Sequence, residues 1–249
     1  MKIPLLLMLT VVFVGGFLLI NQNIPPPISI SPTPSVQPSS VPKGTQIVLG
    51  DKTYTYFLYE IKEPANLTLI PNFVEKKTSL SLFEENHCLF GINGGFYTQA
   101  NKPLGVFFAN HNYIVKTPHE RSFFNGFVYK KNNKLIISQT LPESEGLDFL
   151  FQSGPLLYPN QVLRSENDFP ARRMVLIEIV GNKLYGVTLT GADNIHDGPL
   201  LSEVPQILDQ MPFPIQKGIN LDGGAASAFI TKDLTLGEIN PVGSFLCQK

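Results

Sequence analysis

The tripeptide Gly-Ile-Asn occurs twice in this chain, and each copy leads into a pair of glycines. The copies are residues 91–96 (GINGGF) and 218–224 (GINLDGG). A short amphipathic stretch precedes each copy, at residues 80–86 and 204–211, and the residues just before each Asn are typical of a buried strand. The pattern predicts a helix, a strand and a tight turn, twice. Two strand ends of this kind can meet to build one site.

Glycine pairs directly after a strand allow positive φ and let backbone N–H groups approach a ligand closely. Asn and Asp at the strand end would then direct polar groups at whatever lies over the turns. The alternative interpretation is that both copies are ordinary turns, in which Asn and Gly serve only to allow positive φ.

Strand signals dominate the rest of the chain. Polar turn residues at Asp51-Lys52, Asn132-Asn133 and Gly181-Asn182 separate runs of apolar and β-branched residues, which predicts three hairpins. The paired runs are 46–49 with 54–61, 124–129 with 135–138, and 174–180 with 184–189. Further short strands are predicted at 66–70, 104–108, 226–230 and 243–247. We therefore expect the α+β class: a single globular domain with mixed, mainly antiparallel sheet and a few helices.

The N-terminus differs from the rest of the chain. Residues 3–20 carry no charge, and as a helix they would be about 27 Å long, which is enough to cross a bilayer core. No small-x-small cleavage site follows, so we expect residues 1–20 to be an uncleaved signal anchor; a cleaved signal is the alternative. Residues 21–43 hold seven prolines and predict an extended linker, which leaves 44–249 as an extracytoplasmic domain tethered to the membrane.

Composition restricts the possible partners. The net charge of −1 gives no reason to expect nucleic acid, and a hydrophobic content of 43% is sufficient for a full core. The two cysteines, Cys88 and Cys247, could form a disulfide in an exported chain. A cysteine nucleophile is the competing idea, but no His stands in a recognisable relation to either residue.

Three other segments place polar groups among apolar ones. Ser153 and Gly154 follow the apolar run 149–151, but the G-x-S-x-G pattern of a nucleophile is missing, so Ser153 is interpreted as a hydrogen-bonding residue. Arg172 and Arg173 begin an apolar strand. Because side chains alternate along a strand, we expect one arginine to point inward, to be paired with a carboxylate or an anionic ligand, and the other to point outward.

The loop at residues 193–198 is rich in polar residues, and its His196 is a candidate acid or base. Neither zinc spacing nor the alternating oxygen ligands of a calcium loop are present. We expect no cofactor. Calcium is left open, because the oxygens around Asp222 could hold it, and metal dependence is otherwise unknown.

Six segments occur in an order that resembles the phosphodiester glycosidase family, over about residues 80–247. They are GINGGF (91–96), PLGVFF (103–108), FFNGFVY (123–129), FQSGPLL (151–157), ARRMVLIEI (171–179) and GINLDGGAASAF (218–229). The resemblance implies hydrolysis of the bond between a sugar anomeric carbon and a phosphodiester oxygen, with a sugar phosphate or phosphorylated glycan as substrate. The implied site residues are Asn93, Gly94, Gly95, Ser153, Gly154, Arg173, Asn220, Asp222, Gly223 and Gly224.

This chemistry needs only one carboxylate, because a phosphate leaves far more readily than an alkoxide. We expect Asp222 to act as nucleophile or as base for water and Arg173 to bind the phosphate. Asn93 and Asn220 would hold sugar hydroxyls or phosphate oxygens. Glu178, on the strand face of Arg172, is not expected to be a second acid unless a bulge intervenes.

Two other classes of function remain open from the sequence. The first is a membrane-anchored module that binds glycan or cell-wall polymer without cleaving it, which the altered Gly-Gly-Ala-Ala segment at 223–226 allows. The second is a structural envelope protein in which the glycine pairs are only turns.

Overall fold

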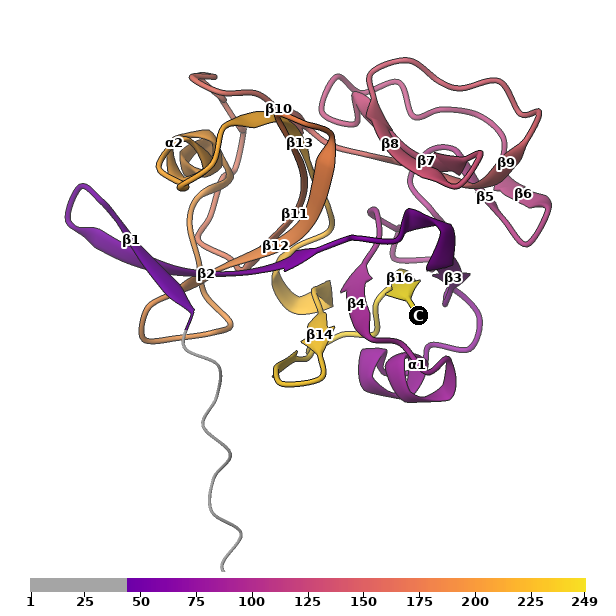
Figure 1. The fold of residues 1–249 in the computed structure, drawn as a ribbon, viewed down its shortest axis with the longest axis horizontal. Helices are drawn as coiled ribbons and strands as arrows, with labels where there is room; N and C mark the ends of the chain where they lie inside the picture. Colours follow the sequence, from indigo (N-terminus) through magenta and orange to yellow (C-terminus); the bar gives the residue numbers. More distant parts are fainter. Residues whose placement is uncertain (1–43) are drawn as a thin grey trace, which may run out of the picture. The chain divides into compact units, whose positions relative to one another are not determined.

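The computed structural model describes residues 44–249, and these form three sheets that share one core (Figure 1). The first sheet has six strands in the order β1-β2-β12-β11-β13-β10. Their bounds are β1 (Thr45–Leu49), β2 (Lys52–Glu60), β12 (Lys183–Gly191), β11 (Arg173–Ile179), β13 (Ile215–Asn220) and β10 (Leu156–Leu157).

The other two sheets have five strands each. The second consists, in order, of β15 (Thr235–Leu236), β14 (Phe229–Thr231), β4 (Phe90–Asn93), β16 (Ser244–Gln248) and β3 (Leu67–Pro71). The third consists of β6 (Asn112–Val115), β5 (Phe107–Ala109), β9 (Leu147–Ser153), β7 (Gly126–Lys131) and β8 (Lys134–Ser138). The helices are α1 (Ser79–Glu85) and α2 (Val204–Asp209), with the 3-10 turns η1 (Pro64–Asn66), η2 (Leu201–Glu203) and η3 (Gly224–Ala226).

The predicted α+β class is wrong. All strand pairings between the named strands of residues 44–249 are antiparallel, so the domain is all-β rather than mixed. The two amphipathic stretches do form helices, but α1 has 7 residues and α2 has 6. Helices this short cover the outer face of one sheet each and do not make a separate layer.

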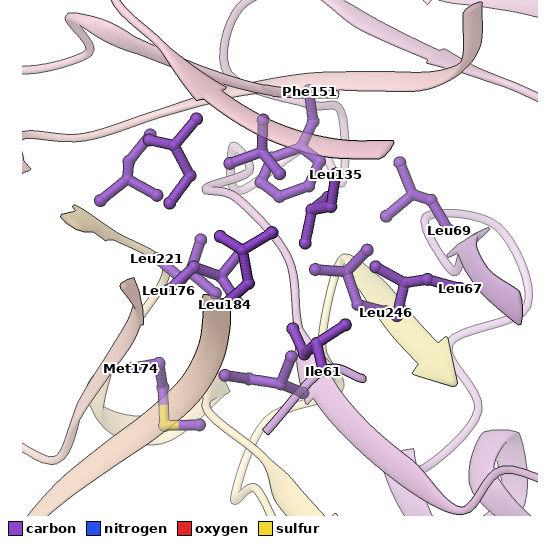
Figure 2. Packing of buried hydrophobic residues seen from close by; sticks show 14 of the residues in the cluster. Ile61, Leu67, Leu69, Leu135, Phe151, Met174, Leu176, Leu184, Leu221 and Leu246 are labelled. Carbon is purple, nitrogen blue, oxygen red and sulfur yellow. The ribbon is translucent and has the colours of Figure 1, made fainter. Parts of the chain in front are cut away.

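The central strands of the sheets are covered on both faces. In β11, Met174 and Leu176 join the central core, whereas Val175 and Ile177 pack in the cluster that contains α2. Figure 2 shows the central core, where side chains from all three sheets meet, including Leu176, Leu246 and Phe151. Because neither face of the central strands is open to water, their sequences are nearly continuous apolar runs.

The three predicted hairpins are confirmed. They are β1 with β2, β7 with β8, and β11 with β12. The turn residues Asn132, Asn133 and Asn182 have φ values of 51°, 59° and 61°. Asparagine tolerates this left-handed region better than other non-glycine residues, which explains its presence in the two-residue turn 132–133 and in the three-residue turn 180–182.

The predicted anchor at 1–20 and linker at 21–43 lie outside the described residues. Within 44–249, none of the helices combines the length and the apolar character that a membrane span requires.

A disulfide joins Cys88 to Cys247, with the two Cα atoms 5.4 Å apart. Cys88 lies two residues before β4, and Cys247 lies in the neighbouring strand β16. Both are buried with Leu82 of α1 and Phe245. The bond therefore fastens the strand that carries the first Gly-Ile-Asn copy to the C-terminal strand.

Replacing both cysteines (Cys88→Ala with Cys247→Ala) is expected to lower the free energy of unfolding by about 2–5 kcal/mol, because the bond closes a loop with a sequence separation of 159 residues. Urea unfolding under non-reducing conditions measures the difference. The wild type treated with reductant is the matched control and should approach the stability of the double variant. Equal urea midpoints for the untreated wild type and the variant would contradict the prediction.

Candidate active site

The two Gly-Ile-Asn strand ends meet, although β4 belongs to the second sheet and β13 to the first. Asn93 Nδ2 donates a hydrogen bond of 2.8 Å to the carbonyl oxygen of Asp222. The backbone N–H of Asp222 donates in return to the carbonyl oxygen of Gly94, at 3.2 Å. The two motifs are therefore tied to each other directly after their strands.

Asn93 is fully engaged in this junction. Its Nδ2 also donates to Gly94 O at 3.1 Å, and its Oδ1 accepts from the backbone N–H of Ala228 at 3.0 Å. Only 1% of the residue is exposed. The expectation that Asn93 binds substrate does not fit this geometry, because its hydrogen-bonding capacity is used to join the two turns.

The first glycine pair is buried as well. The N–H of Gly94 donates to Ser244 O at 2.9 Å, and a Cβ on Gly94 would collide with Ser244 Oγ. A Cβ on Gly95 would lie 2.6 Å from the carbonyl oxygen of Gln152. This pair therefore allows β4 to pack closely against β16 and β9, and it does not line the pocket described next.

The second glycine pair lines a pocket of about 240 Å³. Gly224 has a φ of +62°, and its N–H donates to Arg172 O at 2.8 Å, which holds the turn against β11. The pocket brings together Asp222, Arg173 and Asn220 with the glycines, so the second copy forms the polar floor of the site. The remaining lining residues are Phe96, Phe123, Phe169, Ala171, Leu201 and residues 165–168.

The carboxyl group of Asp222 has an unusual affinity for protons. Burial raises its pKa to about 7, although a hydrogen bond from the backbone N–H of Gly223 acts in the opposite direction. Among the described residues, no ion pair involves Asp222. Its carboxyl group can therefore gain and lose a proton near neutral pH.

Arg173 is held from two sides. Its Nε donates to Pro199 O at 2.9 Å, and its Nη2 donates to Asp168 Oδ1 at 3.2 Å and to the carbonyl oxygen of Phe169. The ring of Phe169 lies 5.7 Å from the guanidinium carbon. Within residues 44–249, Nη1 has no acceptor, so two N–H donors of this pocket-lining side chain are left for a ligand.

Asp168 was not found by sequence reasoning. Besides Arg173, it accepts from the backbone N–H groups of Leu201 at 2.8 Å and Ser202 at 2.9 Å. Burial tends to raise the pKa of Asp168, but these hydrogen bonds and the charge of Arg173 lower it overall. Asp168 thus remains ionised and orients the guanidinium. It lies in a segment without periodicity or motif, where no sequence signal distinguishes it.

Ser153, Gly154 and Asn220 form a second junction beneath the pocket. Ser153 Oγ donates to Asn220 O at 2.7 Å, and Asn220 Nδ2 donates to Gly154 O at 2.9 Å. Ser153 is completely buried, which leaves no route for it to attack a substrate. Asn220 Oδ1 has no hydrogen-bond partner among the described residues, but the atom itself is buried.

The prediction that one arginine points inward and the other outward is wrong. Both are buried, with exposed fractions of 1% for Arg172 and 9% for Arg173, because both faces of the first sheet are covered. Arg172 donates to Ser227 Oγ at 2.8 Å, to Gly237 O at 2.6 Å and to the carbonyl oxygen of Ser227. Burial lowers its pKa to about 10. The N–H donors of Arg172 therefore hold the backbone of Ser227 and Gly237 behind the site.

Two further candidates lie apart from the pocket. Glu178 forms an ion pair with Lys217 at 3.1 Å and lies about 17 Å along β11 from Arg173. His196 is exposed in its loop and does not line the pocket. Between residues 44 and 249, no group of three or more His, Cys, Asp or Glu side chains is arranged to hold a metal ion.

A second pocket, of about 490 Å³, lies on the other side of Asp222. Its lining is polar, and Tyr97 and Asn240 are two of its members; the others are Lys76, Thr98, Gln99, Asn101 and Pro241. Burial and the nearby charge of Asp222 raise the pKa of Tyr97, and its hydroxyl donates to Pro241 O at 2.8 Å. Asp222 is the one residue that lines both pockets.

The domain is similar to known proteins in its sequence and in its fold. The family model for phosphodiester glycosidase matches residues 86–246. The zebrafish N-acetylglucosamine-1-phosphodiester alpha-N-acetylglucosaminidase catalytic domain, solved in a form auto-inhibited by pro-peptide, has a similar fold. Its TM-score is 0.63 at 13% sequence identity, over 82% of this chain and 81% of that chain.

Two bacterial structures are also similar. A hypothetical protein from Synechocystis has a TM-score of 0.53 at 14% identity, over 82% of this chain and 61% of its own. A putative exported protein from Burkholderia pseudomallei has a TM-score of 0.52 at 11% identity, over 79% and 74%. No curated protein matches in sequence. At these identities the structures show a shared fold, and the family model, which spans most of the domain and both glycine turns, shows that the chain belongs to the phosphodiester glycosidase family.

Proposed function

We propose that this protein hydrolyses a sugar-1-phosphodiester by cleaving the bond between the anomeric carbon and a phosphate oxygen. Family membership supports a glycosidase-type activity. The observation that carries the finer proposal is that Asp222, with a pKa of about 7, and Arg173, with Nη1 free, line the same pocket. One group can act at the carbon and the other at the phosphate.

The positions of the two pockets support one arrangement of the parts of the substrate. The phosphate lies next to Arg173, whose planar guanidinium suits phosphate oxygens. Because Asp222 lines both pockets, the anomeric carbon lies above it and the sugar extends into the second pocket. There Tyr97, Asn101 and Asn240 offer a ring and hydrogen-bonding groups to its hydroxyls.

The reaction then needs no second carboxyl group. As a base, ionised Asp222 takes a proton from water, the water oxygen bonds to the anomeric carbon, and the carbon–oxygen bond breaks. The electron pair of that bond leaves on a phosphate oxygen, whose negative charge Arg173 stabilises. As a nucleophile, Asp222 would attack the carbon itself and water would release the sugar afterwards. Both roles require the ionised carboxylate.

We place this activity outside the cytoplasm on a membrane-anchored domain. The uncharged run at residues 3–20 and the buried disulfide support this location, because disulfides persist in oxidising compartments. The substrate would then be a glycan or glycoconjugate of the cell surface.

Asp222→Asn is expected to lower kcat/KM by about 10²–10⁴-fold, because the amide can neither take a proton nor attack carbon. The assay measures free sugar released by the domain from residue 44 onward, from UDP-N-acetylglucosamine and a panel of sugar-1-phosphodiesters. Asp193→Asn, on an exposed loop, is the matched control and should behave like the wild type. A variant within tenfold of the wild type would remove Asp222 from the mechanism. Binding without release by the wild type would indicate a glycan-binding module instead.

The rate is expected to depend on pH through Asp222. Since the ionised form is active, kcat/KM should rise about tenfold per pH unit below a pKa of about 7 and level off above it. Initial rates between pH 5 and 9 with one substrate test this. A rate that falls as the pH rises through 7 would assign the protonated form, and a flat profile would exclude this residue as base or nucleophile.

The same group should affect stability. The pKa of Asp222 is raised from 3.8 to about 7 in the folded state, so between these values the folded protein binds a proton that the unfolded chain has lost. Stability attributable to this residue is therefore lost as the pH rises through that window. Asp222→Asn should be more stable than the wild type at pH 8, by about 1–4 kcal/mol, and this difference should be much smaller at pH 4.5. Urea unfolding at both pH values measures it; an equal difference at both would contradict the shift.

A further inference from the structure

A third pocket, of about 670 Å³, adjoins the pocket of Asp222 and Arg173. The two pockets share five of their lining residues, which are Phe123, Ser165, Glu166, Asn167 and Leu201. The two spaces are therefore neighbours on one surface. The third pocket lies on the Arg173 side of the site, because it has no residue in common with the pocket of Tyr97 and Asn240.

Two arginines line the third pocket, Arg121 and Arg164, and we call it the arginine pocket. The chain has four arginines, and all of them lie in or beside the site. Arg172 and Arg173 are buried and bonded to protein acceptors, as described above. The side chains of Arg121 and Arg164 are exposed and form no hydrogen bond or ion pair with any of residues 44–249. Their donors are available to an anion from outside.

The chemistry of the pocket favours phosphate as that anion. Guanidinium groups bind phosphate oxygens in a bidentate manner. Two guanidinium groups in one pocket therefore suit an anion with several oxygens better than a neutral sugar. Glu166 lies where the two pockets adjoin and would repel an anion there. The anion is therefore expected next to the arginines, beyond the phosphate held by Arg173.

We propose that the arginine pocket binds a second phosphate, carried by the leaving group of the substrate. This inference rests on the proposed function and narrows it. The preferred substrate is a sugar-1-phosphodiester whose leaving group carries another phosphate, either directly attached, as in a nucleoside diphosphate sugar, or one repeat away, as in a polymer of phosphodiester-linked sugars.

The test compares kcat/KM for three substrates with the same sugar: its 1-phosphate methyl ester, its nucleoside diphosphate derivative, and a dimer of phosphodiester-linked repeats. The wild type is expected to prefer at least one of the substrates with two phosphates by about 10–100-fold. The double variant Arg121→Gln with Arg164→Gln should reduce this ratio to near one. The substrate that is preferred identifies the source of the second phosphate. Lys62→Gln with Lys134→Gln removes two exposed charges elsewhere and should keep the ratio.

A binding measurement separates this inference from the proposed function. Calorimetry of the nucleoside diphosphate sugar is done with Asp222→Asn and with the same variant lacking both arginines. A Kd about 10–100-fold weaker without the arginines supports the arginine pocket even if no substrate is cleaved, which would overturn only the proposed function. Cleavage of the methyl ester with no preference for a second phosphate would overturn the arginine pocket and leave the proposed function intact. An equal Kd in both variants, combined with no preference for the dimer in the kinetic test, would also overturn it.

Discussion

The hydrogen bonds of Asn93 are the interaction on which the site depends. This one buried side chain connects the end of β4 in the second sheet to the backbone of Asp222 and Ala228, which follow β13 of the first sheet. Apolar packing alone fixes the distance between two sheets only loosely, whereas the two directional bonds from Asn93 to Asp222 and Ala228 fix the position of the turn that carries the carboxylate. The geometry at Asp222 is therefore set by contacts that face away from the ligand.

Within the described protein, the charged groups that line the pocket are not all paired. Asp222 and Arg173 lie around one small space, yet Arg173 is neutralised by Asp168, and Asp222 has only a backbone N–H. Burial of an unpaired carboxyl group opposes its ionisation and so costs stability at neutral pH. Such an arrangement is typical of a site that is completed by its ligand, and it separates residues that hold the fold from those that meet the substrate.

The sequence predicted the features that depend on local pattern. The hairpins at Asn132-Asn133 and Gly181-Asn182 follow from turn chemistry, and the repeated Gly-Ile-Asn pattern indicated that two distant strand ends meet. The predicted fold class was wrong. An amphipathic pattern predicts that a helix is present, but it does not predict how small a part of the domain the helices make up. The exposure expected for one arginine was also wrong, since alternation along a strand cannot show that both faces are buried. Asp168 and Tyr97 depend on tertiary contacts and had no local signal.

The segment between β10 and β11 supplies residues to both pockets. Asp168 and Phe169 lie beside Arg173, and Arg164 lines the arginine pocket. This segment pairs with no strand of the described domain. Substitutions at Arg164 or Glu166 therefore disturb neither the sheets nor the turn of Asp222. On the proposed role of the arginine pocket, substitutions in this segment would change the leaving group that the pocket accepts, together with those at Arg121, while Asp168 continues to hold Arg173. On this proposal, related domains can differ in the leaving group that they accept while the positions of Asp222 and Arg173 stay the same.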